Sequence, residues 1–202
     1  MGEPVRSWYD AAMTEMAPLT RVPRRVKLRV EDYLRLDDAG AFAPYGKTEL
    51  LDGEIVYMNA QHRPHARIKS RLFRVISEEL ARLGIGLEAL VEGSVSMPPY
   101  NVPEPDIALT AEPEGEGLIP LDSLRLVVEV ADASLRNDLG RKRRIYARHG
   151  IAEYWVVDVN KGLIHQLWQP AGETYGEARE VPFGEAITAA TIPGLTIPTT
   201  GL

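Results

Sequence analysis

The chain has 202 residues, of which 45% are hydrophobic and 26% are charged, a balance typical of one soluble domain with a single core. It contains no cysteine, which excludes a disulfide scaffold, a thiolate zinc site and a cysteine nucleophile. The formal net charge of −6 excludes indiscriminate coating of nucleic acid, so any polyanion would have to meet a local basic patch.

The N-terminal 29 residues differ from the rest of the chain because they end in a basic stretch. Five arginines and lysines lie between positions 21 and 29, with no acidic residue among them. We interpret residues 1–29 as a flexible basic arm rather than a phosphate-binding arm, and residues 30–202 as a single domain. No apolar run approaches the roughly 20 residues of a membrane span, and no secretion signal is found. We therefore expect a cytoplasmic protein that does not enter a membrane.

Hydrophobic spacing and turn residues predict the elements in the first half of the domain. A short helix is expected over 30–36, followed by a hairpin over 48–58 that turns at Asp52-Gly53, because Asp-Gly between two apolar runs is a strong hairpin signal. Apolar residues between 64 and 83 recur at helical spacing, which predicts a long amphipathic helix ended by Gly84. The arginines of this helix fall on its opposite face, which we expect to be solvated.

The second half of the domain combines strands with one more helix. Strand character is found at 87–97, 106–110, 124–131, 153–159, 163–168 and 174–181. A helix is predicted over 138–149 with Gly150 after it, and the chain is expected to close in a tail that ends in Pro193-Gly194 and Pro198. These elements predict an α/β (α+β) fold in which helices flank a mixed β-sheet.

Two carboxylates break the apolar pattern of the predicted sheet, and such breaks tend to mark functional sites. Glu129 lies inside 126–131, a run that is apolar on both faces and typical of a central strand. An ionised carboxylate there costs on the order of several kcal/mol unless it is compensated, and the alternative is a strand-end glutamate that reaches solvent. Asp106 follows Pro105 and opens a neighbouring strand, although alone it would be an ordinary turn residue. As a pair, these acids suit a hard divalent cation such as Mg²⁺.

The helix predicted over 138–149 carries a lysine on its inner face. On a helical wheel, Lys142 shares an arc with Ile145 and Tyr146, whereas Arg141 and Arg144 group on the far side. The alternative for Lys142 is a stem that packs against Tyr146 while the ammonium reaches water. The two arginines are candidates for phosphate contact, with plain solvation as the alternative.

Two further basic residues lie on the apolar arc of the long helix. They are His65 and Lys69, and a histidine in such a position is more often a core or capping residue than a ligand.

Two carboxylates on adjacent strands with an inward ammonium form one known arrangement for phosphodiester hydrolysis, in which the acids hold a metal and the lysine stabilises developing charge.

The order and spacing of these motifs resemble a known family. The segments that carry the resemblance are Glu49–Val56, His65, Pro105-Asp106, Val128–Val130, Lys142 with Tyr146–Gly150, Glu153–Asp158 and Pro193–Leu195. Together they resemble the Uma2 family (DUF820) of restriction-endonuclease-like proteins, in the PD-(D/E)XK nuclease superfamily. The similarity covers residues 30–197 and leaves the N-terminal arm outside it.

The resemblance implies a core made of a helix, three antiparallel strands, a helix and a further strand. It assigns Asp106 and Glu129 as the acids that hold Mg²⁺ or Mn²⁺. In the usual superfamily pattern the lysine follows two residues after the second acid, where this chain has Ala131. The family commonly moves this lysine to the next helix, which gives its role to Lys142. The chain also departs from the family in having Asp132-Ala133-Ser134 where Ser-Pro-Ser is frequent.

Glu54 and His65 match further family positions as candidate catalytic residues, and it stays open which of Glu49, Glu54 and His65 reaches the metal. The function implied is a Mg²⁺-dependent endonuclease that hydrolyses DNA. The alternative is a non-catalytic nucleic-acid-binding or interaction domain that keeps the nuclease fold. A dimer module based on the apolar residues 163–168 is a third interpretation, although these residues fit an ordinary core better. A homodimer would agree with the first function, because a groove between two copies could gather positive charge.

Overall fold

The computed structural model describes residues 24–58 and 61–202, so most of the predicted basic arm lies outside the described residues. The end of this arm lies against the hairpin of the domain. The backbone N–H of Leu28 donates to the carbonyl of Gly53 at 3.0 Å, and the ammonium of Lys27 lies 5.6 Å from the ring centroid of Tyr100. The separation into an arm and a domain at residue 29 stays a prediction.

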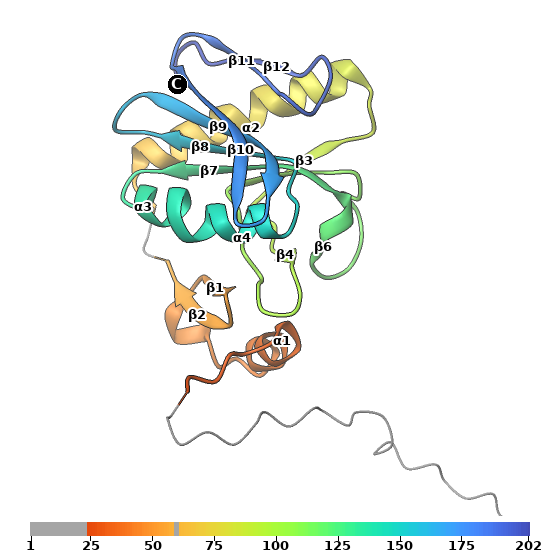
Figure 1. Ribbon diagram of the computed structural model, residues 1–202, viewed down its shortest axis with the longest axis vertical. Helices are drawn as coiled ribbons and strands as arrows, with labels where there is room; N and C mark the ends of the chain where they lie inside the picture. Colours follow the sequence, from red (N-terminus) through yellow and green to blue (C-terminus); the bar gives the residue numbers. More distant parts are fainter. Residues whose placement is uncertain (1–23, 59–60) are drawn as a thin grey trace, which may run out of the picture.

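The N-terminal part of the domain is a small layer beside the main sheet. It contains α1 (Val30–Asp38), a short helical turn η1 (Ala43–Tyr45) and a hairpin of β1 (Thr48–Leu51) and β2 (Glu54–Tyr57), drawn in orange in Figure 1. The hairpin turns through Asp52 at φ 49° and Gly53 at φ 80°, the two positive angles expected of an Asp-Gly turn. The layer has its own hydrophobic cluster, made of Val30, Tyr33, Phe42, Leu50 and Val102.

A six-stranded sheet in the order β10-β9-β8-β7-β5-β3 forms the centre of the domain. In that order the strands span Thr174–Pro182, Leu163–Ala171, Glu153–Asp158, Leu124–Ala131, Ile107–Thr110 and Glu88–Val91. All neighbours are antiparallel except β7 and β8, which are parallel because a helical crossover joins them. The implied core of a helix, three antiparallel strands, a helix and a strand is therefore confirmed.

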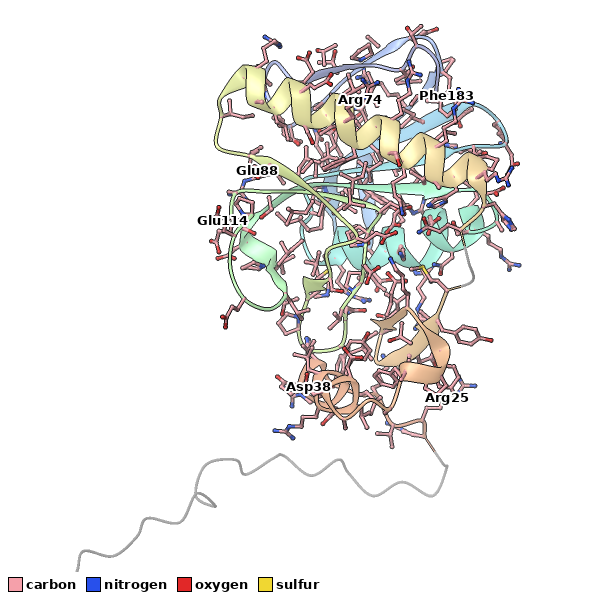
Figure 2. The ribbon with its side chains drawn as sticks, turned by 180° about the vertical axis from the view of Figure 1, so that it is seen from behind. Arg25, Asp38, Arg74, Glu88, Glu114 and Phe183 are labelled. Atoms are coloured by element: carbon pink, nitrogen blue, oxygen red, sulfur yellow. The ribbon has the colours of Figure 1, made fainter. Side chains whose placement is uncertain are left out.

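Helices cover both faces of the sheet, as expected for this fold class (Figure 1). α2 (Arg63–Leu83) covers one face with Leu72 and Ile76, which pack in one cluster with Trp155 of β8. The other face receives Tyr146 of α4 (Arg143–Arg148). Figure 2 shows the molecule from behind, with α2 crossing the sheet in front of it. Burial of each large apolar side chain stabilises the fold by about 1.5–3 kcal/mol.

The crossover between β7 and β8 is less regular than the predicted helix over 138–149. A short turn α3 (Leu135–Asn137) begins it, residues Asp138–Lys142 form a π-helical turn η3, and α4 follows. π-helical turns are rare and often occur at functional sites. In this one, Asp138 and Lys142 are each only 2% exposed.

The predicted strand 87–97 is in fact two strands. β3 ends at Val91 because Glu92 adopts a left-handed backbone conformation, with φ 56°, and redirects the chain. The next strand, β4 (Val95–Ser96), pairs in parallel with β6 (Ile119–Pro120), which the short helical turn η2 (Leu121–Ser123) follows.

The expected C-terminal tail is also structured. β12 (Thr196–Pro198) pairs with β11 (Ala186–Thr188), and Ile187 and Ile197 are fully buried in the same cluster as Leu72. The strands were missed because each is only three residues long. Across the described ranges, none of the helices combines the length and apolar character needed to cross a bilayer.

Candidate active site

Of the two acids singled out in the sequence, Glu129 lies on β7 and Asp106 lies directly before the neighbouring strand β5. β5 and β7 are antiparallel with Ile107 opposite Val128, which sets Asp106 opposite Glu129. Glu129 shares its parity with Val127 and Ala131 and therefore faces α4 rather than α2. Asp106 is 7% exposed and Glu129 is 4% exposed.

Glu129 accepts hydrogen bonds from two side chains of the crossover helix. The ammonium of Lys142 lies 2.9 Å from Oε1 of Glu129, and the hydroxyl of Tyr146 donates to the same oxygen at 2.8 Å. Lys142 also lies 2.8 Å from Oε1 of Glu49, a β1 residue that is 1% exposed. The backbone N–H of Glu104 donates to that oxygen at 2.7 Å. Lys142 thus joins the hairpin to the sheet through two buried carboxylates.

The buried charges around Lys142 determine which groups hold protons. Burial alone would lower the pKa of Lys142, but the negative charges of Glu129 and Glu49 raise it above its ordinary value, so this lysine is protonated. Burial raises the pKa of Glu129 well above its ordinary value against the attraction of Lys142, and nearby carboxylates add to the rise. Because Lys142 faces more than one buried acid, it keeps its proton at neutral pH.

Asp106 is held by donors from the strand and from the start of α2. Its Oδ2 accepts the backbone N–H of Val130 at 2.8 Å. Its Oδ1 lies 3.1 Å from Nε2 of His65 and 3.3 Å from the ammonium of Lys69. Burial would raise the pKa of Asp106, but the hydrogen bond and charge of His65, with the N–H of Val130 and the charge of Lys69, hold it below its ordinary value. Asp106 is therefore ionised at neutral pH.

The other candidates from the sequence lie outside this cluster. The side chain of Glu54 is 47% exposed and pairs with Arg25 at 3.0 Å and with Arg141 at 3.2 Å. Arg141 also donates a hydrogen bond to the carbonyl of Leu51, so its guanidinium binds the hairpin. Arg144 is exposed. Of Glu49, Glu54 and His65, the structure brings Glu49 and His65 to the two acids and leaves Glu54 at the surface.

Sequence reasoning missed two members of the cluster. Tyr146 was treated only as an apolar neighbour of Lys142, although its hydroxyl reaches Glu129. Asp138 was treated as a helix-start residue, although it is 2% exposed. Its position four residues before Lys142 was the available signal, because residues at this spacing share a helix face.

The pKa of Asp138 gives a prediction about stability. Burial raises this pKa from an ordinary value of 3.8 to about 6, against the attraction of Lys142 and a hydrogen bond with Ser134. The folded state therefore holds this proton more tightly than the unfolded state, and the free energy of unfolding falls as pH rises from about 4 to about 6. The side chain of Asn does not ionise, so Asp138→Asn removes this loss. On going from about pH 4.5 to about pH 7.5, the free energy of unfolding of the variant should therefore rise by about 2 kcal/mol relative to that of the parent protein.

Urea unfolding of both proteins at the two pH values measures this difference. An equal pH dependence in the parent and in Asp138→Asn would mean that Asp138 has an ordinary pKa in the folded state.

A separate surface hollow of about 830 Å³ is lined by residues that include Leu34, Leu118 and His149. None of its lining residues belongs to the acid and lysine cluster. We therefore place the candidate site at Asp106 and Glu129 and not in this hollow, because the buried carboxylates and lysine lie at Asp106 and Glu129.

Comparison with known proteins identifies the family. The model of the Uma2 family, described as "Putative restriction endonuclease", matches residues 30–200. This chain belongs to the Uma2 family. The resemblance inferred from the motifs is thereby confirmed, and membership supports a nuclease-like function.

A solved structure shares the fold of this Uma2-family chain. It is described as "a putative nuclease belonging to DUF820" from Anabaena variabilis, with 16% sequence identity and a TM-score of 0.61. The match covers 80% of this chain and 89% of that one. No curated protein matches the sequence significantly. The restriction-endonuclease-like fold expected from the Uma2 motifs is therefore confirmed.

The candidate site offers carboxylate oxygens, which are the donors that hard divalent cations prefer. Within the part of the chain that is described, both hydrogen bonds to Glu129 go to Oε1, which leaves Oε2 for a ligand. No group of three or more His, Asp or Glu side chains converges for metal binding among residues 24–58 and 61–202. Two carboxylates suit Mg²⁺, which binds one or two of them and keeps several waters.

Proposed function

We propose that this chain is a Mg²⁺- or Mn²⁺-dependent endonuclease that hydrolyses phosphodiester bonds of DNA. The main support for the proposal is the pairing of Lys142 with Glu129, 2.9 Å apart, beside Asp106 at the start of the adjacent strand. Burying this ion pair and its neighbouring acids has a desolvation cost that apolar residues of similar size would avoid. Such an arrangement is typical of a functional site rather than of a stabilised core.

In this proposal, Asp106 and Glu129 would hold the cation through their carboxylate oxygens. A divalent cation bound there supplies activation of water and neutralisation of the phosphate charge. The N–H of Val130 and the ring of His65 orient the carboxylate of Asp106. Tyr146 orients the carboxylate of Glu129 in the same way.

In this proposal, Lys142 stabilises the negative charge that develops on the phosphate in the transition state. Its raised pKa means that it carries a proton at neutral pH. Glu49 and Glu129 fix its ammonium between the hairpin and the sheet. A fixed ammonium in a site that excludes most water stabilises a phosphorane-like transition state more than a mobile surface lysine could.

The test is cleavage of supercoiled plasmid by the purified full chain. We expect nicked or linear plasmid with Mg²⁺ or Mn²⁺ and intact plasmid in EDTA. Glu112→Gln is a suitable control, because Glu112 is exposed and follows the opposite end of β5 from Asp106. This variant should cleave like the parent protein.

The alternative function is a non-catalytic nucleic-acid-binding domain. It is favoured by the contacts that His65 and Lys69 already make with Oδ1 of Asp106. Intact plasmid under every metal condition, together with salt-sensitive DNA binding and no Mn²⁺ affinity by calorimetry, would support this alternative and contradict the nuclease.

A further inference from the structure

A second lysine lies at the candidate site, outside the motif that defines the family. The side chain of Lys69 is 8% exposed and its ammonium lies 3.3 Å from Oδ1 of Asp106. That oxygen also meets His65 at 3.1 Å, and Oδ2 accepts the N–H of Val130 at 2.8 Å. A carboxylate has about four lone-pair positions, and two of those of Asp106 are used in hydrogen bonds with the protein, beside the ion pair with Lys69. A cation that approaches Asp106 therefore meets a positive charge already in contact with it.

Lys69 has other acceptors to keep it in place if it leaves Asp106. Its ammonium donates to Oε1 of Gln61 at 2.6 Å and also contacts the carboxylate of Glu92. An ammonium has three N–H donors, and these two acceptors use two of them, while Asp106 is held by the ion pair alone. Loss of the Asp106 contact would leave Lys69 held by the other two.

Glu92 keeps a negative charge with which Lys69 can pair. Hydrogen bonds from Lys47 and Lys69 lower the pKa of Glu92 to about 2, so the carboxylate stays ionised. Its backbone is left-handed, with φ 56°. This conformation is uncommon for a residue other than glycine, and such strain clusters at functional sites.

We propose that Lys69 is a built-in counter-ion of Asp106 which a divalent cation displaces, so that Lys69 sets the affinity of the site for metal. The inference rests on the proposed function, because it assumes that Asp106 is a metal ligand. In the absence of metal, Lys69 compensates the buried charge of Asp106. When metal binds, the ammonium withdraws to Glu92 and Gln61. The cost of this withdrawal weakens metal binding.

Mn²⁺ binding to the full chain, measured by calorimetry without DNA, tests this role. Lys69→Met removes the competing charge and should bind Mn²⁺ about tenfold more tightly than the parent protein. Lys69→Gln keeps a hydrogen-bond donor toward Glu92 without the charge, and should show the same tightening. It serves as the second variant if Lys69→Met does not fold by circular dichroism.

Lys47→Met is the matched control for loss of a nearby positive charge. Lys47 contacts Glu92 as Lys69 does, and lies 3.0 Å from Glu104, but it makes no ion pair with Asp106. Its Mn²⁺ affinity should stay within about threefold of the parent value, since the Asp106 contact is unaffected. Unchanged or weaker Mn²⁺ binding by the Lys69 variants, or equal tightening in Lys47→Met, would overturn the counter-ion role alone. Absence of Mn²⁺ binding in every protein, the parent included, would overturn the proposed metal site as well.

Discussion

Asp106→Asn is expected to lower metal-dependent plasmid cleavage by at least about 100-fold while leaving the fold intact. The amide removes the negative charge that would bind the cation. Its carbonyl oxygen can still accept the N–H of Val130, which Oδ2 of Asp106 accepts at 2.8 Å. The measurements are the rate of plasmid nicking at fixed Mg²⁺ and the affinity for Mn²⁺ by calorimetry.

Two comparisons make the Asp106→Asn result specific. Circular dichroism and thermal unfolding check that the variant is folded, and Glu112→Gln controls for loss of a carboxylate near the same strand. Where the parent protein cleaves plasmid, cleavage by Asp106→Asn at the same rate would rule out Asp106 as a metal ligand of the reaction.

Lys142→Met is expected to abolish cleavage and also to destabilise the protein by about 3–5 kcal/mol, because one partner of a buried ion pair is lost. Glu49 and Glu129 are 1% and 4% exposed, and without Lys142 they would lie buried beside each other without their cation. Urea unfolding measures the loss of stability, and plasmid nicking measures the loss of activity. Lys161→Met, which removes an exposed lysine, should change neither.

A double variant separates the two effects of Lys142. Adding Glu49→Gln to Lys142→Met removes one of the unpaired acids and should restore part of the lost stability. It should not restore cleavage, since the ammonium is still missing. Recovery of cleavage together with stability would mean that Lys142 acts only in folding.

The sequence was informative wherever a side chain contradicted its surroundings. Glu129 in an apolar run and Lys142 on an apolar arc were both predicted to face inward, and both are buried. The Asp-Gly turn and the central position of β7 also followed from local patterns, since short-range turn chemistry and burial on both faces leave a clear signal.

Long-range contacts could not be predicted in this way. Glu49 lies in a hairpin and Lys142 in a helix, and nothing local indicates that they meet at 2.8 Å. The break at Glu92 was missed because left-handed backbone is expected of glycine, and Gly93 follows directly. The π-helical turn was missed because the spacing of apolar residues does not distinguish it from an α-helix.

The hairpin and the central sheet share one buried cation. Lys142 is satisfied by one carboxylate from the central sheet and one from a separate layer with its own apolar cluster. If the hairpin moved away from the sheet, the ammonium would keep one carboxylate of the two. Full pairing of Lys142 therefore depends on the hairpin being docked on the sheet, so a substitution that loosens the hairpin also exposes a charge at the centre of the domain.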